Sequence, residues 1–172
     1  MANLDQRKVY EEYYMKIYTL AYYITRDEEM SKDITQDTFF TAFKKIHQLK
    51  SEEKIESWLI SIATNLSRNA LKKREYRLSE YQPELKERGN PYDQVELKMA
   101  VTDALDSLSP AYKETILLYY YYGFSINEIS QILDVNQKTV SSRLSRARRL
   151  IREKIGLEQK GEGGTRVVRS LP

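Results

Sequence analysis

Residues 125–154 combine two predicted helices, one short break and an excess of arginine, and they restrict the fold more than any other segment. Ser125 followed by Glu128 forms a capping box, which predicts the start of a helix. Apolar residues recur on one face of each predicted helix, residues 134–136 interrupt the pattern, and Asn136 is a good N-cap for the second helix. Two short helices joined in this way are typical of the helix-turn-helix, whose second helix enters the major groove of DNA.

The second of these helices has a one-sided charge pattern. No acidic residue occurs between Lys138 and Arg152. The simpler explanation is that these arginines form an ordinary solvated helix face. It is disfavoured, because such a face usually alternates acids and bases. The helix would repel itself without an anionic partner, and the phosphates of nucleic acid are such a partner. Because the formal net charge of the chain is only +3, binding to DNA must come from this clustered charge.

Composition removes several other classes of protein. The chain contains no cysteine, which excludes disulfides, cysteine metal sites and thiol catalysis. His47 is the only histidine, and no pairing of nucleophile and base is recognisable, so we expect no enzyme, no metal and no cofactor. No apolar run approaches the roughly 20 residues of a membrane span, and the first residues lack an apolar signal segment. We therefore expect a cytoplasmic protein without membrane insertion.

Helical periodicity dominates the rest of the chain, and no strand-like alternation of useful length appears. Three amphipathic patterns fall within residues 10–24, 30–46 and 55–70, and they predict three helices that close one small core. Residues 79–94 are polar and contain two prolines and one glycine, which predicts a flexible linker. The predicted fold is all-α, with two small helical domains at residues 1–78 and 95–157 and a disordered tail at residues 158–172.

Within the second domain, Ser109 and Pro110 predict the start of a helix that ends at Gly123, and Gly156 is expected to end the last helix. The chain has 14 tyrosines, including four in a row at residues 119–122. We expect most of these four to be packing residues, because a helix points consecutive side chains all round its axis. Stacking on single-stranded DNA is the alternative use of such rings.

A second cationic cluster ends the third predicted helix, and Asn65 and Asn69 lie one turn apart at its start; the cluster consists of Arg68, Lys72, Lys73, Arg74 and Arg77. A polar helix end favoured by the helix dipole is one explanation. Two basic helices in two domains favour another, namely a chain that grips two separated DNA sites, with asparagine able to read base edges.

Three motifs in this order resemble the extracytoplasmic-function (ECF) sigma factors, the minimal two-domain promoter-specificity subunits of bacterial RNA polymerase. Residues 30–46 are similar to region 2.2 of that family, residues 56–74 to regions 2.3 to 2.4, and residues 108–155 to region 4. Ser130, Ser141 and Ser145 depart from the residues usual in the family, which leaves the base preference open.

The resemblance implies core RNA polymerase and promoter DNA as partners, and an anti-sigma factor as a possible further one. It implies contacts with the clamp helices of the largest polymerase subunit and with the flap, the former through Asp33, Gln36, Asp37 and Phe40. The first domain would read the −10 element as it melts, through Asn65, Arg68, Asn69, Lys72, Lys73 and Arg74. The second domain would read the −35 element as duplex, through Lys138, Thr139, Ser142, Arg143, Ser145, Arg146, Arg148 and Arg149.

Two other classes of protein share part of this pattern. A stand-alone helix-turn-helix regulator has a similar DNA-reading half, but a receiver half would need strands and an acidic phosphorylation site, and the first half here shows only helices. A helical bundle with a purely structural role would not need two basic helices. Binding to core RNA polymerase separates the three.

Overall fold

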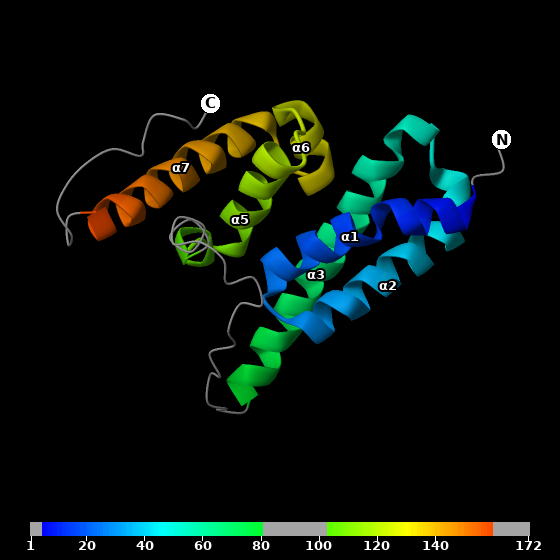
Figure 1. Cartoon of the computed structure of the whole chain (residues 1–172), viewed down its shortest axis with the longest axis horizontal. Helices are drawn as coiled ribbons and strands as arrows, with labels where there is room; N and C mark the ends of the chain where they lie inside the picture. The colour runs from blue at the N-terminus through cyan, green and yellow to red at the C-terminus, as the bar shows by residue number, and fades with distance from the viewer. Residues whose placement is uncertain (1–4, 81–102, 160–172) are drawn as a thin grey trace.

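The computed structural model describes residues 5–80 and 103–159. The first domain consists of α1 (Gln6–Thr25), α2 (Glu28–Lys44) and α3 (Ile55–Glu80), with the short 3₁₀ turns η1 (Ile46–Gln48) and η2 (Glu52–Lys54) between α2 and α3. The second domain consists of α5 (Pro110–Ile116), the π-helical turn η3 (Leu117–Tyr121), α6 (Ile126–Leu133) and α7 (Gln137–Gln159). The described residues contain no strand, and Figure 1 shows α1 to α3 grouped on one side and α5 to α7 on the other.

Side-chain caps begin the first two helices. The Asp5 carboxylate accepts hydrogen bonds from the backbone N–H groups of Arg7 and Lys8, and Asp27 accepts one from Met30. Arg26 ends α1 in the left-handed conformation with φ of 53°, and its N–H donates to the Tyr22 carbonyl. These caps satisfy backbone groups that a helix leaves unpaired, and they produce the sharp turn between α1 and α2.

Small hydroxyl side chains form much of the contact between the helices of the first domain. Thr35, Thr38, Thr64 and Ser67 are fully buried, and each donates its hydroxyl to the carbonyl four residues earlier in its own helix. A buried hydroxyl that bonds within its own helix costs little, and its small size lets neighbouring helices approach closely. Leucine, isoleucine, alanine and phenylalanine fill the rest of this core, as the three sequence patterns predicted.

The helix-turn-helix of the second domain has the predicted form. Ser125 and Glu128 make the full capping box at the start of α6, which ends at Asp134 in the left-handed conformation with φ of 52°. The side-chain oxygen Oδ1 of Asn136 then accepts a hydrogen bond from the backbone N–H of Thr139 at 2.8 Å and caps α7. Buried side chains from α6 and α7 face one another, namely Ile129, Ile132, Leu133, Val140, Leu144 and Ala147.

The two domains pack directly on each other. Helix α5 contacts α1, and α6 contacts α3. A single hydrophobic cluster contains Leu20 and Leu59 from the first domain together with Leu118 and Ile129 from the second. The sequence predicted two domains, but it carried no signal that they would share a surface.

Some details of the sequence analysis are wrong. Helix α7 does not end at Gly156 but continues to Gln159, since one glycine near the end of a helix costs only about 1 kcal/mol. Tyr119, Tyr120 and Tyr121 are exposed rather than packed, because the π-helical turn directs them to the surface and leaves only Tyr122 half-buried. The Ser109 side chain makes no capping bond, although Pro110 does begin α5.

The structure describes only part of the predicted linker and of the predicted tail. The first two residues of the range 79–94 extend α3 to Glu80, and the others lie outside the described residues. Within the predicted tail, residues 158 and 159 belong to α7, and residues 160–172 lie outside the described part of the chain.

Candidate nucleic-acid interface

Helix α7 presents a basic face to solvent. Its apolar side, at Val140, Leu144 and Ala147, is buried against the rest of the second domain, which fixes the orientation of the opposite side. Six of the eight side chains predicted to read the −35 element are exposed on that opposite side, namely Lys138, Ser142, Ser145, Arg146, Arg148 and Arg149. A rigid helix therefore carries a row of cations and hydroxyls outward, as contact with a DNA groove requires.

Several of these side chains are already oriented by neighbours. The Thr139 hydroxyl donates to the Asn136 side chain at 2.9 Å, so Thr139 belongs to the helix cap. Arg148 donates from Nε to the Leu144 carbonyl at 3.2 Å. Arg149 lies 3.7 Å from Glu153 one turn further on, an exposed pair that holds the guanidinium only weakly.

A hollow of about 510 Å³ separates the first turns of α5 and α7. Lys138, Arg143 and Arg146 line it from α7, and Ser109 and Tyr112 line it from α5. Three cations around one concave surface favour a bound anion, and a DNA phosphate fits this description.

The basic end of α3 forms a second surface. Asn65, Asn69, Lys72, Lys73 and Arg74 are exposed, in agreement with a role in contacting an external partner. Arg74 also donates from Nη1 to the Thr25 carbonyl at 3.3 Å, which ties this end of α3 to the end of α1.

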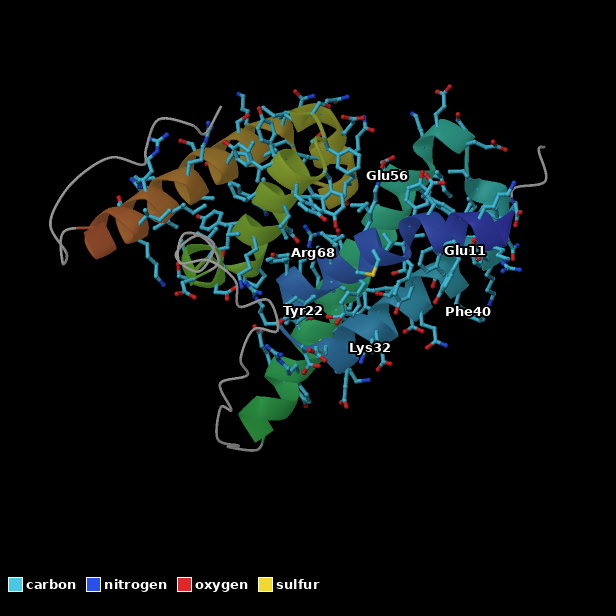
Figure 2. All side chains as sticks on the ribbon, viewed as in Figure 1. Glu11, Tyr22, Lys32, Phe40, Glu56 and Arg68 are labelled. Carbon is cyan, nitrogen blue, oxygen red and sulfur yellow. The ribbon has the colours of Figure 1, made fainter. Side chains whose placement is uncertain are left out.

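Arg68 does not share this exposure. Its guanidinium reaches into the second domain and binds Glu114 of α5 through two hydrogen bonds, Nε to Oε2 at 2.9 Å and Nη2 to Oε1 at 2.5 Å. It also donates from Nη1 to the Leu133 carbonyl at 3.3 Å, at the end of α6. Figure 2 places Arg68 where the ribbons of the two domains meet.

Glu114 also binds Arg143 of α7, with Oε1 3.4 Å from Nη1. The Glu114 side chain is only 2% exposed, while those of Arg68 and Arg143 are 27% and 23% exposed. A buried carboxylate is stable when cations and hydrogen bonds compensate it, and here two arginines do so. One residue predicted to read the −10 element and one predicted to read the −35 element thus share a single carboxylate.

The predicted polymerase-binding residues form a separate face on α2. Asp33, Gln36, Asp37 and Phe40 follow the spacing of one helix face, and all four are exposed. The Phe40 side chain is 68% exposed, and Figure 2 shows it on the side of the molecule away from the second domain. A large exposed ring with acids beside it is typical of an interface that awaits a partner.

Contacts between the domains are the feature of this region that the sequence analysis missed. Besides Glu114, they involve Asp106, which pairs with Arg26 and with Lys113, and Tyr122, whose hydroxyl donates to the Lys16 carbonyl at 2.6 Å. Burial raises the pKa of the Tyr122 hydroxyl and lowers the pKa of the Lys113 ammonium. No spacing rule reveals such partners, because Arg68 lies 46 residues from Glu114 and Lys16 lies 106 residues from Tyr122.

Other kinds of site are not found in the described part of the chain. Residues 5–80 and 103–159 hold no group of three or more histidine, cysteine or acidic side chains that is arranged to bind a metal ion. Within the same residues, no helix combines the length and the apolar character that crossing a bilayer demands.

Both domains match known families. Residues 9–76 match sigma-70 region 2, and residues 98–151 match sigma-70 region 4. The chain is 27% identical over 153 residues to the ECF RNA polymerase sigma factor SigM of Bacillus subtilis (strain 168), covering 84% of this chain and 91% of that protein. It is 32% identical over 146 residues to the ECF RNA polymerase sigma factor SigE of Mycolicibacterium smegmatis, covering 80% of this chain and 56% of that one.

Solved structures share the fold. The sigma factor RpoE of Bartonella quintana, in complex with the anti-sigma factor NepR, superposes with a TM-score of 0.75 at 22% identity, over 90% of this chain and 99% of that one. CnrH, in complex with the cytosolic domain of CnrY, superposes with a TM-score of 0.64 at 19% identity, over 90% of this chain and 89% of that one.

The chain belongs to the sigma-70 family, in its ECF group. It is a transcriptional regulator whose function is promoter-specific initiation with core RNA polymerase, and the alternative of a stand-alone helix-turn-helix regulator is not favoured.

Proposed function

We propose that this sigma factor divides its work among three surfaces: the α2 face binds core polymerase, the basic end of α3 reads the −10 element, and α7 reads the −35 element. The observation that carries this proposal is the exposed face of α7 between Lys138 and Arg152, which carries no acid, on a well-capped helix-turn-helix. The protein contributes binding and positioning, and we propose that it catalyses no reaction itself. Its place of action is then the cytoplasm, where the polymerase works.

For the −35 element, we assign base contacts to Ser142, Ser145 and Arg146, which are exposed on α7. Arginine can donate two hydrogen bonds to one guanine, whereas serine can bond to any of several bases. Arg146 therefore carries most of the direct readout of the base sequence. Phosphate contacts fall to the residues beside them, namely Lys138, Thr139, Arg143, Arg148 and Arg149. The hollow between α5 and α7 supports this assignment, since Arg143 and Lys138 line it together.

For the −10 element, we assign the exposed side chains Asn65 and Asn69 to bases, and Lys72, Lys73 and Arg74 to phosphates. Unstacking a base costs a few kcal/mol of free energy, and hydrogen bonds from a polar side chain to that base offset the cost. Arg68 belongs to the same phosphate-binding group, although it contacts Glu114 in this structure.

For core polymerase, we assign the α2 face with Phe40 as the apolar anchor and Asp33, Gln36 and Asp37 as its polar rim. The clamp helices of the largest subunit are the proposed partner of this face, and the flap is the proposed partner of the second domain. An anti-sigma factor is a further proposed partner, supported by the complexes in which the structural relatives RpoE and CnrH were solved.

Run-off transcription with core polymerase and this chain tests the proposal. We expect transcripts from a template that carries both promoter elements, and loss of transcripts when either element is scrambled. Core polymerase without the chain is the control. A chain that binds promoter duplex but neither binds core polymerase nor supports initiation would overturn the proposal in favour of the stand-alone regulator.

A further inference from the structure

Two exposed amide side chains, Asn127 and Gln137, meet where the helices of the helix-turn-helix begin, and we call them the amide pair. Gln137 is the first residue of α7, and Asn127 is the second residue of α6. The Gln137 side chain donates from Nε2 to Oδ1 of Asn127 at 3.0 Å, although the two residues are ten positions apart. Both residues are exposed, so the amide pair lies on the surface of the second domain and not in its core.

Caps fix the backbone on both sides of the amide pair. The Ser125 hydroxyl accepts the backbone N–H of Glu128 at 3.3 Å, and the Ser125 N–H donates to the Glu128 carboxylate at 2.8 Å. Asn136 holds the first turn of α7 through the backbone N–H of Thr139 at 2.8 Å. Each helix start is thus held by its own cap. The exposed bond of the amide pair competes with water and adds little to the free energy of unfolding.

The effect of the amide pair is to orient two flexible side chains. A glutamine side chain has many rotamers, and the entropy lost in fixing one of them weakens its binding to any ligand. The bond to Asn127 fixes the Gln137 amide before DNA arrives. A side chain oriented in advance binds more tightly than the same side chain moving freely, and it discriminates better between ligands.

The remaining hydrogen-bonding groups of Gln137 match one base. A glutamine amide has two N–H donors and one carbonyl oxygen, and the bond to Asn127 uses one N–H. The other N–H and the oxygen Oε1 remain. Adenine presents an acceptor, N7, and a donor, the N6 amino group, in the major groove, and a glutamine amide pairs with both. The two N–H groups of the Asn127 amide suit a phosphate oxygen of the neighbouring backbone.

The position of Gln137 on α7 separates it from Arg146. Gln137, Ser141 and Ser145 are all exposed and repeat every four residues, so Gln137 continues the side of α7 that carries Ser145 toward the start of the helix. At about 1.5 Å of rise per residue, Gln137 and Arg146 are about 14 Å apart along the helix axis. Successive base pairs are about 3.4 Å apart, so the two side chains reach different base pairs.

Building on the proposed function, in which α7 reads the −35 element, we propose that the amide pair is a further specificity site. Gln137 donates to N7 of one adenine and accepts from its N6 amino group. Asn127 is the positioning residue, because it holds the Gln137 amide through Oδ1 and donates from Nδ2 to a DNA phosphate. The adenine lies in a different base pair from the one that Arg146 reads.

Transcription from a template library tests this site. The full chain is combined with core polymerase, and the templates carry every base at each −35 position together with a downstream barcode that the transcript copies. We expect the wild type to prefer adenine about ten-fold at one position, as a two-bond contact with a base does. Gln137→Ala should reduce this preference to less than about two-fold, and it should not alter the position that responds to Arg146→Ala.

Three further variants distinguish base reading from a loss of folding. Gln137→Glu should shift the preference at the same position from adenine to cytosine, because a carboxylate accepts from the cytosine N4 amino group and cannot donate to N7. Asn127→Ala should lower the adenine preference about three-fold, because Gln137 is no longer held. Asn127→Asp keeps the acceptor for Gln137 but loses the N–H donors, so the adenine preference should persist while transcription from all templates falls alike.

Gln131→Ala is the matched control, because Gln131 is an exposed amide of the same helix and is not the partner of Gln137. It should keep the wild-type preference at every position. A Gln137→Ala variant with wild-type preferences, or a preference for guanine at the position that depends on Gln137, would overturn the adenine site. An Asn127→Ala variant that keeps the full adenine preference would overturn the positioning role.

The same library separates this site from the proposed function. If Gln137→Ala changes nothing while Arg146→Ala alters its own position, the amide pair does not read DNA and the proposed function stands. If the wild type shows no base preference anywhere in the −35 element, both the proposed reading by α7 and the role of the amide pair are wrong.

Discussion

Replacing Glu114 with glutamine is the sharpest test of how the second domain is stabilised. The substitution keeps the size of the side chain and one oxygen acceptor, but it removes the negative charge. Arg68 and Arg143 then face a neutral group in a place where little water can reach, since the Glu114 side chain is only 2% exposed.

The structure sets the size of the effect. Removing one partner from a fully buried ion pair costs about 3–5 kcal/mol. Both arginines here are about one quarter exposed, and glutamine still accepts a hydrogen bond, so water and the retained bond offset part of that cost. We expect Glu114→Gln to lower the free energy of unfolding by about 2 kcal/mol, which is a fall in Tm of about 4–8 °C for a chain of this size.

Urea unfolding followed by circular dichroism measures this change. The matched control is Glu153→Gln, which removes the carboxylate of an exposed pair with Arg149 at 3.7 Å and should alter the free energy by less than about 0.5 kcal/mol. If Glu114→Gln proves as mild as Glu153→Gln, the charge of Glu114 does not stabilise the fold, and the reasoning from burial is refuted.

Three further predictions concern the proposed surfaces and the capping box. Asp37→Arg should weaken the binding of core polymerase in a competition assay while the helical signal stays intact; binding equal to that of the wild type would exclude the α2 face. Arg146→Ala should cost about 1–3 kcal/mol of binding free energy at particular −35 sequences only. Arg148→Ala should weaken binding to all sequences alike and reduce the slope of log affinity against log salt by about one unit. Transcription from a set of −35 variants measures both effects. Hydrogen bonds from Ser125 lower the pKa of the Glu128 carboxyl, so the stability that this carboxylate contributes is present above its unfolded pKa and is lost as the pH falls through its folded pKa. Glu128→Gln should remove this acid-sensitive contribution, which is less than about 1 kcal/mol. If the wild type and Glu128→Gln differ in unfolding free energy by the same amount at neutral and acid pH, the prediction is contradicted.

Local chemistry made much of the fold predictable. The capping box at Ser125 and the cap at Asn136 depend on residues three positions apart, and both formed as the spacing indicated. The apolar stripes of α3, α6 and α7 became the buried faces because a helix repeats its surface every three or four residues. The exposed face of α7 followed from the same periodicity.

Long-range contacts were not predictable in this way. Glu114 lies in a helix whose last four residues are all buried, and nothing in its neighbouring residues indicates that its partners come from α3 and α7. The π-helical turn at residues 117–121 was equally hidden, since four consecutive tyrosines suit an ordinary helix as well. For the candidate site, the exposure of Arg146 and Phe40 agrees with their predicted roles, which remain predictions until DNA and polymerase binding are measured.

The hydroxyl-rich core of the first domain has a consequence for how the molecule comes apart. Thr35, Thr38, Thr64 and Ser67 each bond to a carbonyl of their own helix, so shape and apolar contact hold these helices together. Ions and hydroxyls, together with the shared hydrophobic cluster, hold this domain to the second one. Salt weakens ion pairs and spares apolar contacts, so a rise in ionic strength loosens the contact between the domains more than the core within the first domain.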